Sequence, residues 1–311
     1  MGRNEGERLK RCLRSIPEHL AAVYVDSELT DGSVQYAQGG GVEVVQLDLT
    51  IPFTAARASN AGLHRLLEQA SNLAFVHFVG GDCELEPPWL SEAINFLDCN
   101  VTAAAVCARR RERYPGASFY NKICDREWGT PIGEAEACGG AALFRLSALR
   151  QCGFVDPSLI AGEEPELCYR LREGGWRIWC IDQEMTIHNA DLLHFSQWWK
   201  RAVPSGLGYA QVWHKAAKFP SLGLYLREIF RVFAWTLGLP ILGVLLAIFF
   251  GPIYLLSVPA LWLLQFARLA WRNGLAVSFH PLIGKAAECT GALRYLLGYV
   301  MLRPLKAICC K

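Results

Sequence analysis

Residues 232–267 form a stretch of 36 residues without a charged side chain. A helix that crosses the hydrocarbon core of a bilayer needs roughly 20 apolar residues, so this stretch is nearly two crossings long. Gly251 and Pro252 lie at its middle and are typical of a turn. The sequence therefore predicts a helical hairpin over about 232–267, which spans the membrane twice or enters one leaflet as a re-entrant hairpin. A buried helical hairpin of a soluble protein is the alternative.

Basic residues flank this stretch on both sides. Arg227 and Arg231 precede it, and Arg268 and Arg272 follow it. Because cytoplasmic flanks of membrane helices carry an excess of Lys and Arg, we expect both flanks, and the domain before them, on the cytosolic side of a multi-pass protein. The last segment, 291–310, combines apolar and basic residues, which predicts an interfacial helix.

The charge of the chain changes along its length. From residue 215 onward there are 11 Lys and Arg against two Glu, whereas residues 1–214 carry 20 basic and 27 acidic residues. An acidic front part and a basic, apolar rear part indicate two different environments. We predict one domain over 1–226 and a membrane-associated helical region over 227–311.

The twelve cysteines are scattered, and none of them forms a CxxC pair. Structural zinc sites usually carry such pairs, so the spacing gives no sign of a zinc cage. We interpret the cysteines as reduced thiols of a cytosolic domain, with disulfides as the alternative.

Short apolar segments alternate with amphipathic ones in the front part. We expect strands in 21–27, 42–48 and 73–82, and helices in 6–16 and 55–70. This order predicts an α/β domain with a mainly parallel sheet.

Asp26 and Asp82 each lie at the carboxyl end of a predicted strand. Asp26 closes "AAVYVD" and Asp82 closes "LAFVHFVGGD". In α/β sheets, ligands bind beyond the carboxyl ends of the strands, so the two residues are candidates for a shared polar cleft. A cap or turn role is the alternative for each of them.

Six segments follow one another over about residues 2–201: "GRNEGERLKRCLRS", "VYVDSELTDGS", "ASNAGL", "FVGGDCELEPPWL", "ACGGAALFR" and "GFVDPSLIAGEEPELCYRLREGGW". Their order resembles that of the inverting family-2 glycosyltransferases of GT-A fold. The resemblance implies an α/β fold of the Rossmann-like GT-A type. It also implies an enzyme that moves a sugar from a nucleotide-sugar donor to an acceptor hydroxyl.

The resemblance also assigns residues to the donor. Asp26 matches the acid that contacts the base, and Arg57 could substitute for the family's arginine, which is Ser59 here. Lys200 and Arg201 could hold the departing diphosphate. The implied donor-binding set is Asn4, Glu5, Asp26, Arg57, Asn60, Lys200 and Arg201.

A divalent cation, Mg²⁺ or Mn²⁺, is the implied cofactor. Residues 80–82, "GGD", stand where the family carries an Asp-x-Asp pair that grips the metal and, through it, the donor phosphates. Asp82 keeps the last acid, whereas Gly80 replaces the first. His188 matches a position near metal and phosphate, and a histidine with local hydrogen bonds is the alternative reading.

Glu164 in "GEEPELC" matches the general base, which takes the proton of the attacking acceptor hydroxyl. Alternatively, it is one of several first-turn acids that stabilise a helix. Trp198 and Trp199 in "QWWKR" could form the floor of the acceptor site, although an amphipathic helix on the bilayer also fits them.

Together these interpretations predict an inverting glycosyltransferase at the cytosolic face of a membrane. Its acceptor would be lipid-linked or membrane-proximal, and we expect no nucleic-acid partner. The alternative is a catalytically retired fold that serves as a membrane scaffold or nucleotide-sugar sensor. The family carries a strand ahead of the segment that begins at Gly2. We therefore also expect the sheet of this chain to lack its first strand.

Overall fold

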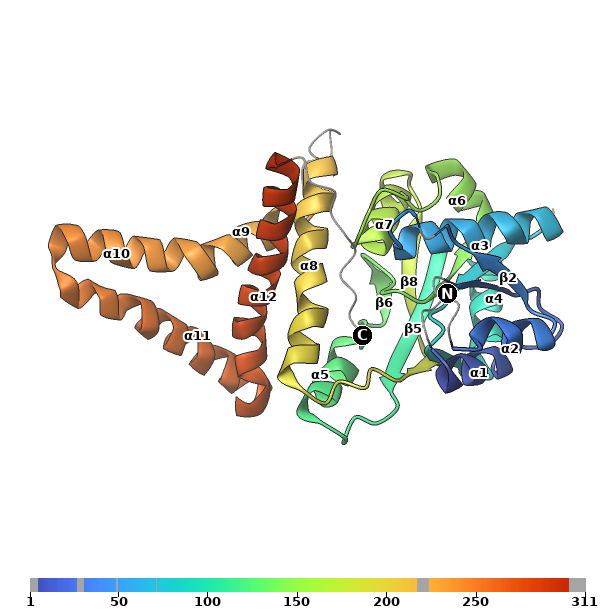
Figure 1. The fold of residues 1–311 in the computed structure, drawn as a ribbon, viewed down its shortest axis with the longest axis horizontal. Helices are drawn as coiled ribbons and strands as arrows, with labels where there is room; N and C mark the ends of the chain where they lie inside the picture. Colours follow the sequence, from blue (N-terminus) through green and yellow to red (C-terminus); the bar gives the residue numbers. More distant parts are fainter. Residues whose placement is uncertain (1–4, 27–30, 49, 71, 217–223, 302–311) are drawn as a thin grey trace. The chain divides into compact units, whose positions relative to one another are not determined.

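The computed structural model describes residues 5–26, 31–48, 50–70, 72–216 and 224–301 (Figure 1). The chain divides into two compact units, Met1–His194 and Phe195–Lys311. This division falls earlier than the boundary expected at residue 226. The reason is that a long helix before the change in composition packs with elements that follow it.

The first unit contains both helices and strands, and the elements expected in 6–16, 21–27, 42–48, 55–70 and 73–82 occur in it. The helices are α1 (Glu7–Arg14), α2 (Ser33–Gly39), α3 (Ala55–Gln69), α4 (Trp89–Cys99), α5 (Phe119–Glu127), α6 (Leu146–Cys152) and α7 (Glu163–Glu173). The strands are β1 (Val23–Asp26), β2 (Glu43–Gln46), β3 (Phe75–Phe78), β4 (Cys83–Leu85), β5 (Ala103–Glu112), β6 (Gly133–Ala135), β7 (Ala142–Arg145) and β8 (Arg177–His188).

Six of these strands form one mixed sheet. Its order is β3-β7-β5-β8-β4, and β6 also pairs with β8. The β5–β8 pair is parallel, whereas the pairs β3–β7, β5–β7, β4–β8 and β6–β8 are antiparallel. The α/β class is confirmed, but the expectation of a mainly parallel sheet is wrong for these strands. Strand β7 runs against both of its neighbours, and the short strands β4 and β6 run against β8.

Strands β1 and β2 pair in parallel as a separate two-stranded sheet. Helix α3 lies close against β1, since a Cβ atom at Gly62 would be 2.9 Å from Val25 Cγ2. Among the described residues β1 has β2 as its ladder partner, and no strand joins it to β3. The expected lack of a first strand stays a prediction.

The main core lies between the six-stranded sheet and its helices. Strand β5 enters it as a run of small residues, Ala103–Ala108, that are at most 2% exposed. Helix α4 packs Trp89 and Leu97 into the same core. Because alanines leave room for close packing, the last residues of β5 are held firmly where they emerge from the core.

The second unit is helical. Its elements are α8 (Phe195–Ala216), α9 (Leu226–Phe233), η1 (Ala234–Gly238), α10 (Leu239–Phe250), η2 (Pro252–Leu256), α11 (Ser257–Asn273) and α12 (Leu275–Val300). Helix α10 ends at Gly251, whose φ of 113° is left-handed, and α11 returns beside α10 (Figure 1). The predicted helical hairpin with a Gly-Pro turn is confirmed.

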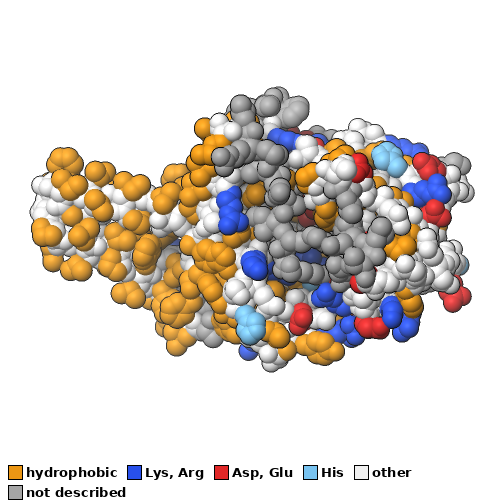
Figure 2. All heavy atoms as spheres, in the orientation of Figure 1, with side chains coloured by type: hydrophobic (Ala, Val, Ile, Leu, Met, Phe, Trp, Pro, Cys, Tyr) orange, Lys and Arg blue, Asp and Glu red, His pale blue; other side chains and the backbone are white. Residues whose placement is uncertain are grey.

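The hairpin exposes large apolar side chains along its length (Figure 2). Ile248, Phe249 and Leu264 are 69%, 75% and 67% exposed. The helices over 226–250 and 252–272 are long and apolar enough to cross a membrane. The hairpin is therefore not a buried core element of this chain, in contrast to the alternative that the sequence left open.

Helices α8 and α12 pack closely through glycines. A Cβ atom at Gly206 would overlap the backbone of Glu288, and one at Gly291 would overlap the backbone of Val203. Residues 291–300 are therefore the end of a longer helix that packs on α8, and their position at the membrane interface stays a prediction. Residues 302–310 of that segment lie outside the described residues.

We expect Gly291→Ala to destabilise the second unit by about 1–3 kcal/mol, because the added methyl group overpacks a backbone-to-backbone contact. Gly284→Ala on the same helix is the matched control, since its Cβ atom would meet Trp198 at an ordinary 3.8 Å. Thermal unfolding in detergent measures both. Equal midpoints for the two variants would contradict the close α8–α12 contact.

Candidate active site

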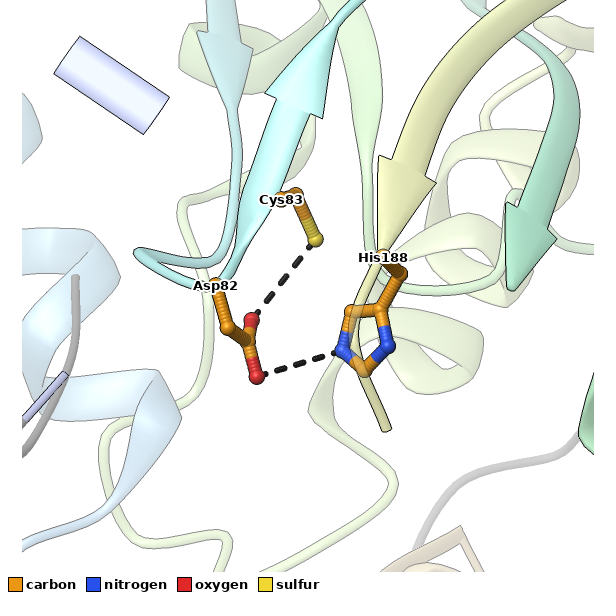
Figure 3. A group of neighbouring side chains, drawn as sticks. All are labelled: Asp82, Cys83 and His188. Carbon is orange, nitrogen blue, oxygen red and sulfur yellow. Dashed lines mark hydrogen bonds and ion pairs between the residues drawn. The ribbon is translucent and has the colours of Figure 1, made fainter. Parts of the chain in front are cut away.

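Asp82, Cys83 and His188 lie together where β4 begins and β8 ends. Cys83 and His188 face each other in the β4–β8 register. His188 Nε2 lies 3.2 Å from Asp82 Oδ2, and the Cys83 thiol lies 3.7 Å from Asp82 Oδ1 (Figure 3). The pairing of two strands thus brings together the two residues that the sequence predicts as metal ligands.

The imidazole of His188 is held in a fixed orientation. The ring of Trp128 meets it edge to face, with 4.5 Å between ring centroids. Opposite His188 in the β5–β8 register, the buried Glu112 accepts hydrogen bonds from the backbone N–H of Ala190 at 2.8 Å and from the Asn121 amide at 3.2 Å. Glu112 therefore fixes the chain where it leaves β8.

This cluster has the donor atoms for a divalent cation. The ligand atoms of Asp82, Cys83 and His188 all lie within 4.8 Å of one another. Burial raises the pKa of the Cys83 thiol well above its usual value, so this thiol stays neutral. His188 Nδ1 is buried and has no hydrogen-bond partner among the described residues. Carboxylate oxygens suit Mg²⁺ and Mn²⁺, so Asp82 fits such an ion, with His188 beside it.

Gly80 leaves the space that Asp82 uses. A Cβ atom at Gly80 would be 2.7 Å from Asp82 Oδ1. A second acid at position 80 would therefore require the Asp82 side chain to turn. The Asp82 carboxylate therefore lies close to the space that a side chain at position 80 would need.

Glu164 lies in the first turn of α7. Its Oε1 accepts a hydrogen bond from the backbone N–H of Cys138 at 2.6 Å and lies 3.2 Å from the Cys168 thiol, which donates to it. Burial raises the pKa of the Glu164 carboxyl. A carboxylate with a raised pKa is a stronger proton acceptor, so the local chemistry suits a general base. Burial raises the pKa of the neighbouring Glu163 as well.

Arg110, near the end of β5, is a functional candidate that sequence reasoning missed. Its guanidinium lies over the Trp128 ring, 5.6 Å from the centroid. Its positive charge acts on both Cys83 and Glu164, lowering the pKa of each against the effect of burial. The signal was present as three successive arginines at the end of a buried strand, but the sequence does not show which one turns inward.

The predicted donor-binding residues lie on several elements. Asp26 ends β1, is 2% exposed and accepts a hydrogen bond from the Tyr24 hydroxyl at 2.7 Å. Glu5 is buried, and its Oε2 atom lies 3.1 Å from Arg8 Nε. Asn4 lies outside the described residues. The roles of all three stay predictions.

Two further donor-binding candidates lie on α3 and contact the backbone of other segments. The Arg57 guanidinium donates to the carbonyl oxygens of Ile51 and Pro52, each at 2.7 Å. Asn60 donates through Nδ2 to the Val155 carbonyl at 2.6 Å, while its Oδ1 is buried without a hydrogen-bond partner in the described part of the chain. Arg57 thus stabilises the segment that precedes α3, and Asn60 connects α3 to the loop that follows α6.

The remaining four candidates belong to the first turns of α8, in the second unit. Trp198 is 4% exposed, and its ring centroid lies 4.2 Å from that of His280. Trp199, Lys200 and Arg201 follow it on the same helix. Trp198 therefore packs within the helical unit, and the acceptor and diphosphate roles of the four residues stay predictions.

Two solved glycosyltransferases are similar in structure. A mannosyltransferase from Pyrobaculum calidifontis, in complex with GDP-Man and Mn²⁺, matches with a TM-score of 0.63 at 16% identity, over 95% of this chain and 85% of that one. TarS from S. aureus, residues 1–349, matches with a TM-score of 0.50 at 14% identity, over 98% of this chain and 91% of that one. The chain has the fold of these glycosyltransferases. No protein-family model and no curated protein matches the sequence.

We expect Gly139→Ala to disturb the site more than its backbone strain alone explains. Gly139 has a φ of 77°, and its Cβ atom would be 2.9 Å from Arg110 Nη2. Gly41 has a φ of 75° and open space around its Cβ position, so Gly41→Ala measures strain alone, about 1–2 kcal/mol. Because the end of the Arg110 side chain can move away but loses its present contacts, chemical denaturation should show a loss about 0.5–1.5 kcal/mol larger for Gly139→Ala. Equal losses of unfolding free energy in the two variants would mean that the position of the Arg110 guanidinium does not depend on this loop.

Proposed function

We propose that this protein is an inverting glycosyltransferase that moves a sugar from a nucleotide-sugar donor to an acceptor hydroxyl at the cytosolic face of a membrane. The observation that carries the proposal is the environment of Glu164. Its carboxylate is held by the Cys138 amide and the Cys168 thiol, and burial raises its pKa. It lies in the same unit as the Asp82–His188 pair and Arg110.

The donor would bind through its diphosphate at the Asp82–His188 pair. The similar mannosyltransferase contains GDP-Man and Mn²⁺, which supports a nucleotide-sugar donor and a divalent cation. A Mg²⁺ or Mn²⁺ ion bound there would neutralise the departing diphosphate. Asp82 would hold the ion through carboxylate oxygen, and Arg110 would add a positive charge to the same region. Glu5, Asp26 and Asn60 are the candidates for nucleotide contacts.

Glu164 would then accept the proton of the acceptor hydroxyl. As the hydroxyl oxygen attacks the anomeric carbon, the bond from that carbon to the diphosphate breaks, and the nucleoside diphosphate leaves with the bonding electrons. The two hydrogen bonds to Oε1 fix the carboxylate, so its orientation is set before the acceptor arrives. Attack opposite to the leaving group inverts the anomeric centre.

The apolar hairpin suggests a lipid-linked or membrane-proximal acceptor. Helices long enough to span a bilayer follow the fold of a sugar-transferring enzyme, and basic residues flank them on both sides. With both flanks on one side of the membrane, the positive-inside tendency favours a cytosolic catalytic unit. This part of the proposal rests on the composition of the hairpin.

A catalytically retired membrane scaffold or nucleotide-sugar sensor is the second candidate. Gly80 favours it, because it removes one acid of the usual metal-binding pair. The raised pKa and fixed carboxylate of Glu164 favour the enzyme, since a scaffold needs neither. Transfer from a panel of nucleotide sugars with Mn²⁺ or Mg²⁺ separates the two.

We expect Glu164→Gln to lower turnover by about 10²–10⁴-fold while donor binding is retained, because the amide has the same size but cannot accept the proton. Glu163→Gln is the matched control, since it neutralises the adjacent acid, which is half-buried and also has a raised pKa. Donor affinity is measured by calorimetry and turnover by release of nucleoside diphosphate.

Turnover of Glu164→Gln within two-fold of the parent would remove Glu164 from the mechanism. No transfer by the parent with any donor, together with intact nucleotide-sugar binding, would favour the sensor.

We expect a short polar epitope inserted between Gly251 and Pro252 to be accessible from the face of the membrane opposite to the catalytic unit. This outcome follows if both helices cross the bilayer, because the turn then emerges on the far side. Protease protection in sealed vesicles of both orientations measures it, and the same epitope at the N-terminus is the control. Protection of the turn epitope from both sides would indicate a re-entrant hairpin, and accessibility of both epitopes from one side would indicate a hairpin that does not cross the membrane.

A further inference from the structure

A second cluster of metal-ligating side chains surrounds Glu164. Cys168 lies one helical turn after Glu164 on α7, and Cys138 lies in the loop between β6 and β7. The two thiols are 0% and 1% exposed, and their sulfur atoms are 3.6 Å apart. Both cysteines are free. The sulfur atoms and a Glu164 oxygen lie within 4.8 Å of one another.

The distances within this cluster agree with tetrahedral coordination of one thiophilic cation. With Zn–S bonds of about 2.3 Å, two thiolate ligands of a tetrahedral ion lie about 3.8 Å apart, and a thiolate and a carboxylate oxygen lie about 3.6 Å apart. The observed separations are 3.6 Å for Cys138–Cys168 and 3.2 Å for Cys168–Glu164. A disulfide would instead require the sulfur atoms to approach to about 2.05 Å.

A further thiol and a balancing charge lie beside this cluster. The Cys107 thiol on β5 hydrogen-bonds with Cys138. Arg110, three residues later on the same strand, acts electrostatically on both Cys107 and Glu164. Without a cation the two thiols are neutral, because hydrogen bonds with Cys107 and Cys168 raise the pKa of Cys138, and burial, against the hydrogen bond with Cys138, raises the pKa of Cys168. A cation that binds them takes the place of their protons. The two thiolates and the carboxylate then carry three negative charges, which a divalent cation and the guanidinium together neutralise. Such compensation is what a buried set of charges requires.

We propose that Cys138, Cys168 and Glu164 form a binding site for a thiophilic divalent cation of the Zn²⁺ class, distinct from the Asp82–His188 pair. Thiolate ligands select soft ions, whereas Mg²⁺ and Mn²⁺ prefer oxygen, so the two sites differ in ion preference. A cation bound here uses the Glu164 carboxylate as a ligand and keeps it from accepting a proton. The site is therefore inhibitory, a consequence that rests on the proposed role of Glu164, whereas the binding itself does not.

Co²⁺ is the probe for the site, because a thiolate-bound tetrahedral Co²⁺ ion gives sulfur-to-metal charge-transfer absorption. The full chain, reduced and stripped of metal in detergent, is titrated with Co²⁺ and then with Zn²⁺. We expect a thiolate band that Zn²⁺ displaces. The band should weaken in Cys138→Ser and in Cys168→Ser, and disappear in the double variant. Circular dichroism confirms that each variant is folded.

Cys83→Ser is the matched control, since Cys83 belongs to the other cluster, and we expect this variant to keep the band. Absence of a thiolate band in the reduced parent would overturn the proposal. A band that is lost in Cys83→Ser but kept in the double variant would also overturn it, because the ion would then bind beside Asp82.

The inhibitory effect is measured separately, as transfer with Zn²⁺ at saturating Mn²⁺ relative to the zinc-free rate of the same variant. We expect Zn²⁺ to slow the parent and to leave the ratio near one in the double variant. A parent that binds Co²⁺ at the two cysteines but keeps its full rate with Zn²⁺ would retain the site and overturn the role of Glu164 as the base.

Discussion

The parallel pairing of β5 with β8 is the constraint on which the candidate active site depends. Strand β5 leaves the alanine-rich core at Ala108 and carries Arg110 and Glu112, and its partner β8 ends at His188. The register places Glu112 opposite His188, so one ladder positions both the guanidinium and the imidazole. Strand β4 adds to the other edge of β8 and brings Asp82 to the same end. A shift of one residue would turn Arg110 to the opposite face of the sheet.

Electrostatic balance explains why buried ionisable groups persist beside one another in this unit. Burial raises the pKa of Glu164 and of the Cys83 thiol, and Arg110 counteracts it at both places. The guanidinium reaches this position because Gly139 and Gly140 carry no side chains and adopt left-handed conformations beneath it. The position of the guanidinium therefore depends on the shape of this loop as well as on the strand that carries it.

Much of the first unit could be predicted from the sequence, because the signals are local. Apolar runs identified β1, β2 and β3, and spacing identified α1 and α3. Strand direction was not predictable: β7 lies between β3 and β5 and runs against both, which depends on pairing between distant segments. Arg110 was missed for the same reason, since its contact with Gly139 crosses 29 positions of the chain.

In the rear part of the chain, composition and packing give different information. A run without charged residues indicates an apolar environment such as a bilayer, which excludes charge, and it therefore predicted the position of the hairpin. It could not show that α8, which carries both charged and aromatic residues, belongs to the helical unit. That membership depends on Gly206 and Gly291, which let two backbones approach across more than 80 residues. A change in composition therefore marks where the environment changes, whereas the boundary of a compact unit lies where backbone contacts cease, here about 30 residues earlier.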